Sequence, residues 1–300
     1  MCVAAPTFSN VRGGAMLLNT GFSIPLVGLG TYKIRGEDVP KAVEGALAAG
    51  YRMFDTAKYY LNEKELGDAL AQLLPKFGLT RQDIFLTTKF FPEPENNTEG
   101  ARRLVTESLE NLRTDYLDLV LIHYPKASES ENNDPINPIN RRDAYVELEK
   151  LKKEGVIRSV GVSNYEKRHL EEIVAYQESA PAVNQMEFHP HFTRPEAKEY
   201  CDKNGIFFQA FSSLARHEPK LVEDPVVMNI AKTHNTSVEL VLLAFALCQK
   251  VGIVPKSTNP ERIAANMSVV DIKLSASEVE ALNSLNQNQH YIRCTGWEVL

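Results

Sequence analysis

The sequence has few cysteines and no long apolar run, and each shortage excludes a class of protein. Its four cysteines, Cys2, Cys201, Cys248 and Cys294, lie far apart with no C-x-x-C pair. Such spacing is neither a disulfide framework nor a zinc site, and it is typical of a protein of the reducing cytosol. No stretch approaches the roughly 18 consecutive apolar residues of a membrane helix, and residues 1–14 show no basic segment of a secretory leader. We therefore expect a cytoplasmic protein without a membrane segment.

Positive charge is also scarce. The formal net charge is −6 with a sequence pI of about 5.7, whereas a nucleic-acid-binding protein usually carries a basic surface. Hydrophobic residues make up 43% and charged residues 24% of the 300 positions, which is ordinary globular usage and excludes a disordered chain. We expect a globular protein with no nucleic-acid partner.

Short apolar runs alternate with stretches of helical spacing along most of the chain. The predicted strands are Leu26–Gly30, Tyr51–Asp55, Ile84–Lys89, Tyr116–His123, Ile157–Val162, Ala182–Met186, Ile206–Phe211 and Val251–Lys256. The predicted helices are Val39–Ala49, Glu63–Leu74, Thr98–Leu112, Asp143–Lys153, Lys167–Gln177, Pro195–Lys203, Val226–His234, Val238–Gln249, Pro260–Asn266 and Ser277–Leu285. Because parallel neighbours need long crossovers, eight such repeats predict an α/β fold of the (β/α)8 TIM-barrel type.

An open, doubly wound parallel sheet is the alternative fold. It would be favoured by a G-x-G-x-x-G turn after the first strand, but Lys33 stands where the third glycine after Gly28 and Gly30 would be. We therefore expect residues 1–300 to form a single barrel domain with extra helices.

Three segments lie outside the repeating pattern. Residues 15–25 read as an N-terminal β-hairpin turning at Asn19-Thr20-Gly21, which could close one end of the barrel. Ala127–Asn140 is polar and reads as a surface loop, and residues 286–300 form a C-terminal tail.

Polar residues end almost every predicted strand. Asp55, Lys89 and His123 end three successive strands at steps of 34 residues. In a barrel, active sites form where the strands end, so these side chains should converge. A single such residue is more often a solvated cap, but three in succession favour an active site.

Six motifs in this order resemble those of the aldo-keto reductases. Residues 55–63, Asp-Thr-Ala-Lys-Tyr-Tyr-Leu-Asn-Glu, match the family's D-T-A-x-x-Y-x-N-E signature. The other five are Thr87-Thr88-Lys89, Ile122-His123-Tyr124-Pro125, Gly161-Val162-Ser163-Asn164, Asn184-Gln185-Met186-Glu187-Phe188-His189-Pro190 and Val254-Pro255-Lys256-Ser257-Thr258. The resemblance extends from about Leu17 to the C-terminus.

The resemblance implies reduction of aldehydes and ketones by hydride transfer from NADPH, without a metal. It makes Tyr60 the general acid, since the step of five residues from Asp55 selects Tyr60 over its neighbour Tyr59. A free tyrosine has a pKa of about 10, so a nearby cation, Lys89, would help it to donate a proton. Asp55 would hold Lys89, and His123 would orient the carbonyl group and assist proton transfer, depending on its protonation state.

The resemblance also implies an NADPH/NADP⁺ site. Ser163, Asn164 and Gln185 would bind the carboxamide, and Phe211 would stack on the nicotinamide. Ser212 and Leu214 would lie along the pyrophosphate, while Lys256, Ser257 and Arg262 would hold the 2′-phosphate. Asn266 would contact the adenine, next to Ala265 where the family often has glutamate. The remaining predicted cofactor residues are Gly30, Thr31, Tyr32, Asp55 and Thr258.

The predicted substrate residues are mostly aromatic. Tyr32, Tyr60, His123, Tyr124 and Trp297 would line the pocket. The resemblance implies that the tail, residues 286–300, covers the substrate pocket, and Trp297 in it is alternatively a hydrophobic anchor for the tail. The resemblance implies a small-molecule carbonyl substrate and a monomer, since most relatives with this loop pattern are monomers.

Two other functions are compatible with such a barrel. One is a relative that binds the cofactor but serves as a channel-associated subunit or a lens-type structural protein. The other is a metal-dependent hydrolase that uses Glu187, His189 and His191, although no further carboxylate–histidine set completes that site. We expect no metal.

Overall fold

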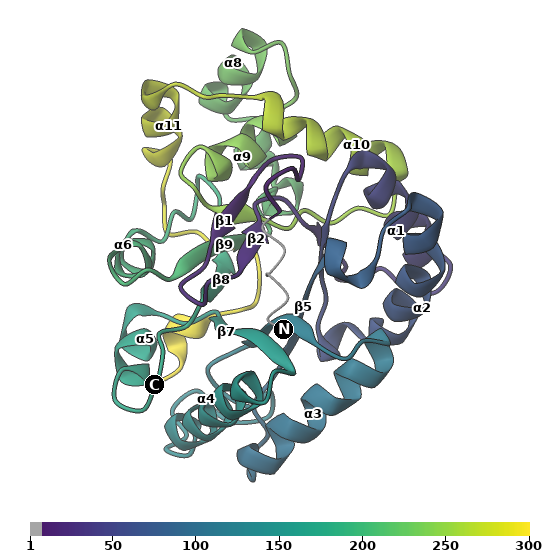
Figure 1. Cartoon of the computed structure of the whole chain (residues 1–300). Helices are drawn as coiled ribbons and strands as arrows, with labels where there is room; N and C mark the ends of the chain where they lie inside the picture. The colour runs from purple at the N-terminus through teal and green to yellow at the C-terminus, as the bar shows by residue number, and fades with distance from the viewer. Residues whose placement is uncertain (1–7) are drawn as a thin grey trace.

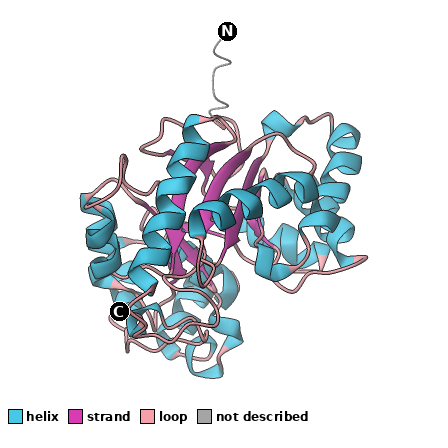
Figure 2. Cartoon of the chain, turned by 90° about the horizontal axis from the view of Figure 1, so that it is seen from below, coloured by secondary structure: helices cyan, strands magenta, loops and turns pink. Residues whose placement is uncertain are grey.

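The centre of the protein is a ring of parallel strands surrounded by helices. In the computed structural model, which describes residues 8–300, eight strands lie side by side in chain order, each parallel to the next (Figures 1 and 2). They are β3 (Leu29–Gly30), β4 (Met53–Asp55), β5 (Phe85–Phe90), β6 (Leu117–Ile122), β7 (Ile157–Ser163), β8 (Val183–Glu187), β9 (Phe207–Phe211) and β10 (Gly252–Ile253). Cys2 and the first half of the segment tested for a leader lie outside the described residues.

The first and last strands close the ring. The amide of Gly28 donates to the carbonyl of Ile253 at 2.9 Å, and the amide of Gly30 donates to that of Pro255 at 3.0 Å. The amide of Ile253 in turn donates to the carbonyl of Leu26 at 2.8 Å. These bonds make the sheet a barrel, so the predicted (β/α)8 fold is confirmed and the open sheet is excluded.

Helices follow the strands and cover the outside of the barrel (Figure 1). They are α1 (Asp38–Ala49), α2 (Glu63–Leu73), α3 (Asn97–Leu112), α4 (Asn137–Lys153), α5 (Lys167–Ile173), α6 (Pro195–Lys203), α7 (Pro219–Val222), α8 (Pro225–Thr233), α9 (Val238–Leu247), α10 (Pro260–Met267) and α11 (Ala276–Asn283). Their apolar faces pack on the outer faces of the strands in one extended core. None of the helices in the described part of the chain is long and apolar enough to cross a membrane.

The predicted hairpin is present at the N-terminal end of the barrel. β1 (Ala15–Leu17) pairs antiparallel with β2 (Ser23–Pro25), and the hairpin is seen in purple across the barrel in Figure 1. The hydroxyl groups of Thr20 and Ser159 lie 2.7 Å apart, and the Asn19 amide donates to the carbonyl of Pro181 at 3.1 Å. The hairpin therefore closes the end of the barrel opposite to that where polar residues end the strands.

The prediction of a surface loop up to Asn140 is wrong at its end. Helix α4 begins at Asn137, six residues before the predicted start at Asp143, and Asn137 and Asn140 are buried. Pro138 fits the first helical turn, and the two asparagine amides donate to loop carbonyls, that of Asn137 to Glu131 and that of Asn140 to Pro94. Neither contact is visible in the local hydrophobic pattern, and that of Asn140 joins residues 46 positions apart.

Gly67 generates a prediction about the packing of the outer helices. A β-carbon added there in α2 would lie 2.3 Å from the carbonyl oxygen of Asn111 in α3. Alanine favours a helix over glycine by about 1 kcal/mol, but the clash should cost more than that gain. We expect Gly67→Ala to lower the free energy of unfolding by about 1–3 kcal/mol in a urea titration.

The matched control is Lys64→Ala, an exposed position of the same helix. It should leave the free energy of unfolding within about 0.5 kcal/mol of the wild type. A Gly67→Ala protein as stable as the wild type would show that the two helices can move apart freely.

Candidate active site

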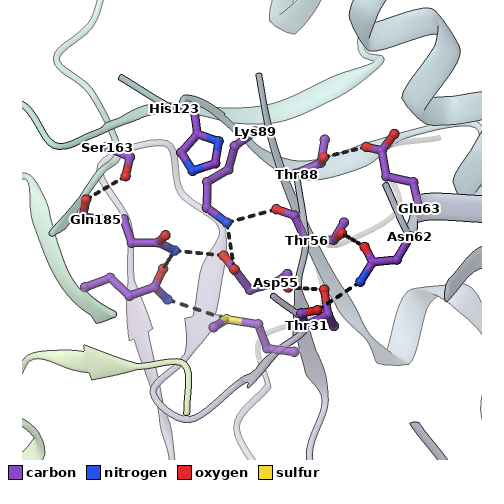
Figure 3. Close-up of polar contacts among 12 residues, drawn as sticks. Thr31, Asp55, Thr56, Asn62, Glu63, Thr88, Lys89, His123, Ser163 and Gln185 are labelled. Atoms are coloured by element: carbon purple, nitrogen blue, oxygen red, sulfur yellow. Dashed lines mark hydrogen bonds and ion pairs between the residues drawn. The ribbon is translucent and has the colours of Figure 1, made fainter. Parts of the chain in front are cut away.

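A buried ion pair lies where β4 and β5 end (Figure 3). The Lys89 Nζ donates to Asp55 Oδ1 at 2.6 Å and to the carbonyl of Thr56 at 2.9 Å. The side-chain amide of Gln185, on β8, donates to the other carboxylate oxygen of Asp55 at 2.8 Å. Burial lowers the pKa of Lys89, and the Asp55 carboxylate opposes that effect. The predicted pairing of these two residues is thus present.

Tyr60 lies beside this pair. It ends a single 3-10 turn, Lys58–Tyr60, and its ring centroid is 4.9 Å from the Lys89 Nζ. Burial raises the pKa of Tyr60, and the Asp55 carboxylate adds to the effect, so the hydroxyl keeps its proton at neutral pH. Tyr59 is 59% exposed, although both rings reach the same cavity.

His123 follows β6 and faces Tyr60. Its ring stacks on Phe91 at a centroid distance of 4.7 Å and lies 5.8 Å from the Tyr60 ring. Burial lowers the pKa of His123, and Lys89 lowers it further, so the imidazole is neutral at neutral pH. Within residues 8–300, its Nδ1 has no hydrogen-bond partner.

Two residues of the 55–63 signature support the site from outside the cavity (Figure 3). The Asn62 amide donates to the carbonyl of Thr31 at 2.9 Å, and its oxygen accepts from the Thr56 hydroxyl at 2.7 Å. Glu63 accepts from the Thr88 hydroxyl at 2.6 Å. These bonds tie the strand ends together and thereby fix the backbone around Asp55.

Most of the predicted site residues share one cavity of about 970 Å³ at these strand ends. Those in its lining are Gly30, Tyr32, Asp55, Tyr60, His123, Ser163, Asn164, Gln185, Phe211, Ser212, Leu214, Lys256, Ser257, Arg262 and Asn266, with Ala265 beside them. The structure brings residues from all eight strand ends to this cavity, as the strand-end pattern predicts.

Five predicted residues are not in its lining. Lys89 is fully buried behind Asp55, and Thr31 is buried with its hydroxyl donating to the Asp55 carbonyl at 2.9 Å. Tyr124 packs against Phe91, and Thr258 also lies outside the lining. The ring of Trp297 packs edge-on against that of Phe192, with 5.4 Å between the ring centroids. Trp297 is therefore placed to anchor the tail rather than to line the pocket.

The polar groups predicted to hold the carboxamide already interlock. The Ser163 hydroxyl donates to the carbonyl of Gln185 at 2.8 Å, and the Asn164 amide donates to that of His123 at 3.0 Å. The Gln185 amide is shared between Asp55 and Gln209. These bonds fix the orientation of the three side chains.

Four cations line the cavity: Lys33, Arg216, Lys256 and Arg262. Between residues 8 and 300, none of them has a carboxylate within ion-pair distance, while the buried hydroxyl of Ser213 beside them has no partner. Arg262 lies in the first turn of α10. Asn259 caps the start of this helix, because its side-chain oxygen accepts hydrogen bonds from the backbone amides of Glu261 and Arg262. Arg262 thus lies at a helix N-terminus, which favours an anionic group, and the other three cations in the same lining fit a ligand that carries further phosphates.

The sequence interpretation missed several lining residues. Lys33 and Tyr59 adjoin the predicted residues Tyr32 and Tyr60, and Phe91 lies two positions after Lys89, so a wider reading of the strand ends would have included them. Arg216, Ile292 and Cys294 come from a loop and from the tail, and no local pattern marks them. Their place depends on how these segments fold back over the barrel.

The alternative metal ligands form ordinary hydrogen bonds. His189 Nε2 lies 3.0 Å from Glu187 Oε1, and His191 Nδ1 lies 2.7 Å from the hydroxyl of Tyr291. Across residues 8–300, no three His, Cys, Asp or Glu side chains are placed to hold one metal ion.

The buried pair yields a stability prediction. Asp55→Asn leaves the buried Lys89 ammonium without its counter-charge, so the free energy of unfolding should fall by about 3–5 kcal/mol in a urea titration. The double variant Asp55→Asn/Lys89→Met should recover most of that loss. If the double variant is as unstable as the single one, the ion pair is not the cause.

The comparisons with known proteins agree with this geometry. The family model described as "Aldo/keto reductase family" matches residues 26–287. Aldose reductase B of Dictyostelium discoideum is 35% identical over 88% of this chain and 90% of that protein, and glyoxal reductase of Bacillus subtilis (strain 168) is 36% identical over 91% and 92%. The crystal structure of a Bombyx mori aldo-keto reductase in complex with NADP has a TM-score of 0.87 and 30% identity, over 96% of this chain and 97% of that one. With the barrel, the buried lysine pair and these relatives in agreement, this chain belongs to the aldo-keto reductase family.

Proposed function

We propose that the protein reduces aldehydes and ketones to alcohols with NADPH, with Tyr60 as the general acid. The observation that carries the proposal is the single cavity that contains both Tyr60 and His123, beside the buried Lys89–Asp55 pair, and four cations free to bind phosphates. Family membership supports carbonyl reduction in general, and the silkworm relative was solved with NADP.

The chemistry divides between the cofactor and the side chains. When bound, NADPH supplies a hydride for the carbonyl carbon. Tyr60 holds the proton that the carbonyl oxygen needs and passes it on from its hydroxyl. The Lys89 ammonium stabilises the negative charge left on the Tyr60 oxygen, and Asp55 keeps Lys89 in place.

His123 orients the substrate rather than protonates it. Because burial and Lys89 lower its pKa, the ring is neutral and carries only one N–H group. A neutral imidazole facing the cavity can donate that hydrogen to the carbonyl oxygen and direct it toward Tyr60. Tyr32, Tyr59 and Phe91 form an aromatic wall near it, which suits an apolar substituent on the substrate.

The cofactor lies along the cavity in this proposal. Ser163, Asn164 and Gln185 bind the carboxamide, Phe211 stacks on the nicotinamide, and Ser212 and Leu214 follow the pyrophosphate together with Lys33 and Arg216. Lys256, Ser257 and Arg262 hold the 2′-phosphate, which makes NADPH preferred over NADH, and Asn266 contacts the adenine.

We further propose that the chain works as a monomer of one domain in the cytosol. The described cysteines, Cys201, Cys248 and Cys294, form no disulfide with one another, which suits a reducing compartment. All residues assigned to the reaction come from one chain, so the site needs no second copy.

Tyr60→Phe tests the role of the acid. The variant lacks only the hydroxyl, so reduction of an aromatic aldehyde, followed by NADPH absorbance, should fall by a factor of about 100 or more, while the dissociation constant for NADPH stays within about twofold. Tyr59→Phe is the matched control and should keep most of the activity. If Tyr59→Phe loses the activity instead, Tyr59 is the acid.

Arg262→Ala tests the phosphate site. Loss of a charge-assisted bond to the 2′-phosphate should raise the dissociation constant for NADPH by about tenfold to a hundredfold and leave that for NADH nearly unchanged, as measured by fluorescence titration. The control is Lys232→Ala, which removes one positive charge from α8, outside the cavity lining. Equal weakening of both cofactors would contradict the assignment.

A further inference from the structure

The C-terminal tail, residues 286–300, forms one wall of the cavity. Ile292 and Cys294 line it together with Tyr60 and His123. Neither residue belongs to a helix or strand, so the backbone must be held there by contacts with the barrel. The contacts that hold the tail therefore shape the proposed reductase site, and this inference rests on that proposed function.

One anchor lies before Ile292. Glu187, at the end of β8 and 3% exposed, accepts from the amide of Tyr291 at 2.8 Å and from that of Ile292 at 3.4 Å. His189 lies 3.0 Å from the same carboxylate, and its ring stacks on that of Tyr291 at 5.3 Å. The buried Glu187 carboxylate is thus occupied by the backbone of the tail and by His189.

A second anchor lies after Cys294. Arg168, in the first turn of α5, donates to the carbonyl of Trp297 at 2.5 Å and also to that of Val299. The buried His169 accepts from the Glu166 amide at its Nδ1, so its Nε2 carries the hydrogen and donates to Val299 at 2.9 Å. Burial lowers the pKa of His169 to about 3, which keeps this donor neutral.

Between the anchors the tail touches the proposed cofactor site. Gly296 packs so closely on Asn164 that a β-carbon there would lie 2.1 Å from the carbonyl oxygen of Asn164. This close approach requires the tail backbone at Gly296 to be held in contact with Asn164, which follows β7. The two anchors on either side supply that constraint, because each bonds the tail backbone rather than a flexible side chain.

We propose that Glu187, Arg168 and His169 are positioning residues that hold the tail on the barrel. They fix the backbone at Tyr291–Ile292 and at Trp297–Val299. They thereby position Ile292 and Cys294 in the cavity wall that a bound carbonyl compound would contact. They touch neither the substrate nor the reacting atoms. Their loss should therefore weaken the binding of bulky substrates and leave the chemical step intact.

Two neighbouring cations of α5 provide a matched pair of variants. Arg168 and Lys167 are both exposed, but only Arg168 reaches the tail, whereas Lys167 pairs with Glu171 at 3.7 Å. Arg168→Ala should raise the KM for a bulky aromatic aldehyde by about three- to tenfold, with kcat and the dissociation constant for NADPH within about twofold. Lys167→Ala should change none of these quantities by more than about twofold.

The fluorescence of Trp297 reports on the tail without any reaction. It is the only tryptophan of the chain, and it packs against Phe192, His290 and Arg194. Release of the tail in Arg168→Ala should increase quenching by acrylamide and shift the emission to the red. Glu187→Gln, which replaces one acceptor oxygen by a donor, should do the same from the other anchor.

The outcomes separate this inference from the proposed function. Unchanged quenching in both Arg168→Ala and Glu187→Gln would contradict the proposal that these residues hold the tail. Increased quenching with an unchanged KM would contradict the proposal that the held tail positions Ile292 and Cys294 for the substrate. A wild-type protein that reduces no aldehyde would instead overturn the proposed function, and quenching would still decide whether these residues hold the tail.

Discussion

A fully buried lysine ammonium constrains the whole site. Lys89 is 0% exposed, and such a charge is tolerated only where a counter-charge and hydrogen bonds satisfy it. Its partners come from the end of β4, and β8 supplies the amide of Gln185 that holds Asp55 in turn. The barrel must close for these groups to meet, so the fold and the site depend on each other. The same charge lowers the pKa of His123 and lies against the ring of Tyr60.

Much of this arrangement could be predicted from the sequence because parallel strands bring their ends to one rim. The even steps from Asp55 to Lys89 and His123 indicated three side chains at the same edge, and the structure places them together. The resemblance to a known family supplied what spacing cannot, namely which tyrosine to choose.

The remaining features depend on contacts between distant segments. The early start of α4 is stabilised by bonds from Asn137 and Asn140 to loop carbonyls, of which that of Pro94 lies 46 residues before Asn140. The sequence predicts that Trp297 lines the cavity, but its ring packs against Phe192. The tail residues that line the cavity are instead Ile292 and Cys294. The only regular element of the tail is a short 3-10 turn, Gly296–Glu298. Its path therefore depends on contacts with the barrel, among them those of Glu187, Arg168 and His169, and no pattern within the tail itself encodes that path.

The cavity thus has a floor formed by the strand ends and one wall formed by the C-terminal tail. Its floor includes Asp55 and Gln185, with Lys89 buried behind Asp55. Its lining also carries Lys33, Arg216, Lys256 and Arg262, which have no ion-pair partner among residues 8–300 of this otherwise acidic protein. The most direct test of the central claim is to mix the wild-type protein with NADPH and an aromatic aldehyde in the presence of a strong chelator, and to quantify both NADPH and alcohol. We expect one alcohol formed for each NADPH oxidised, at a rate that the chelator does not change. No oxidation of NADPH with any reactive aldehyde would contradict the claim.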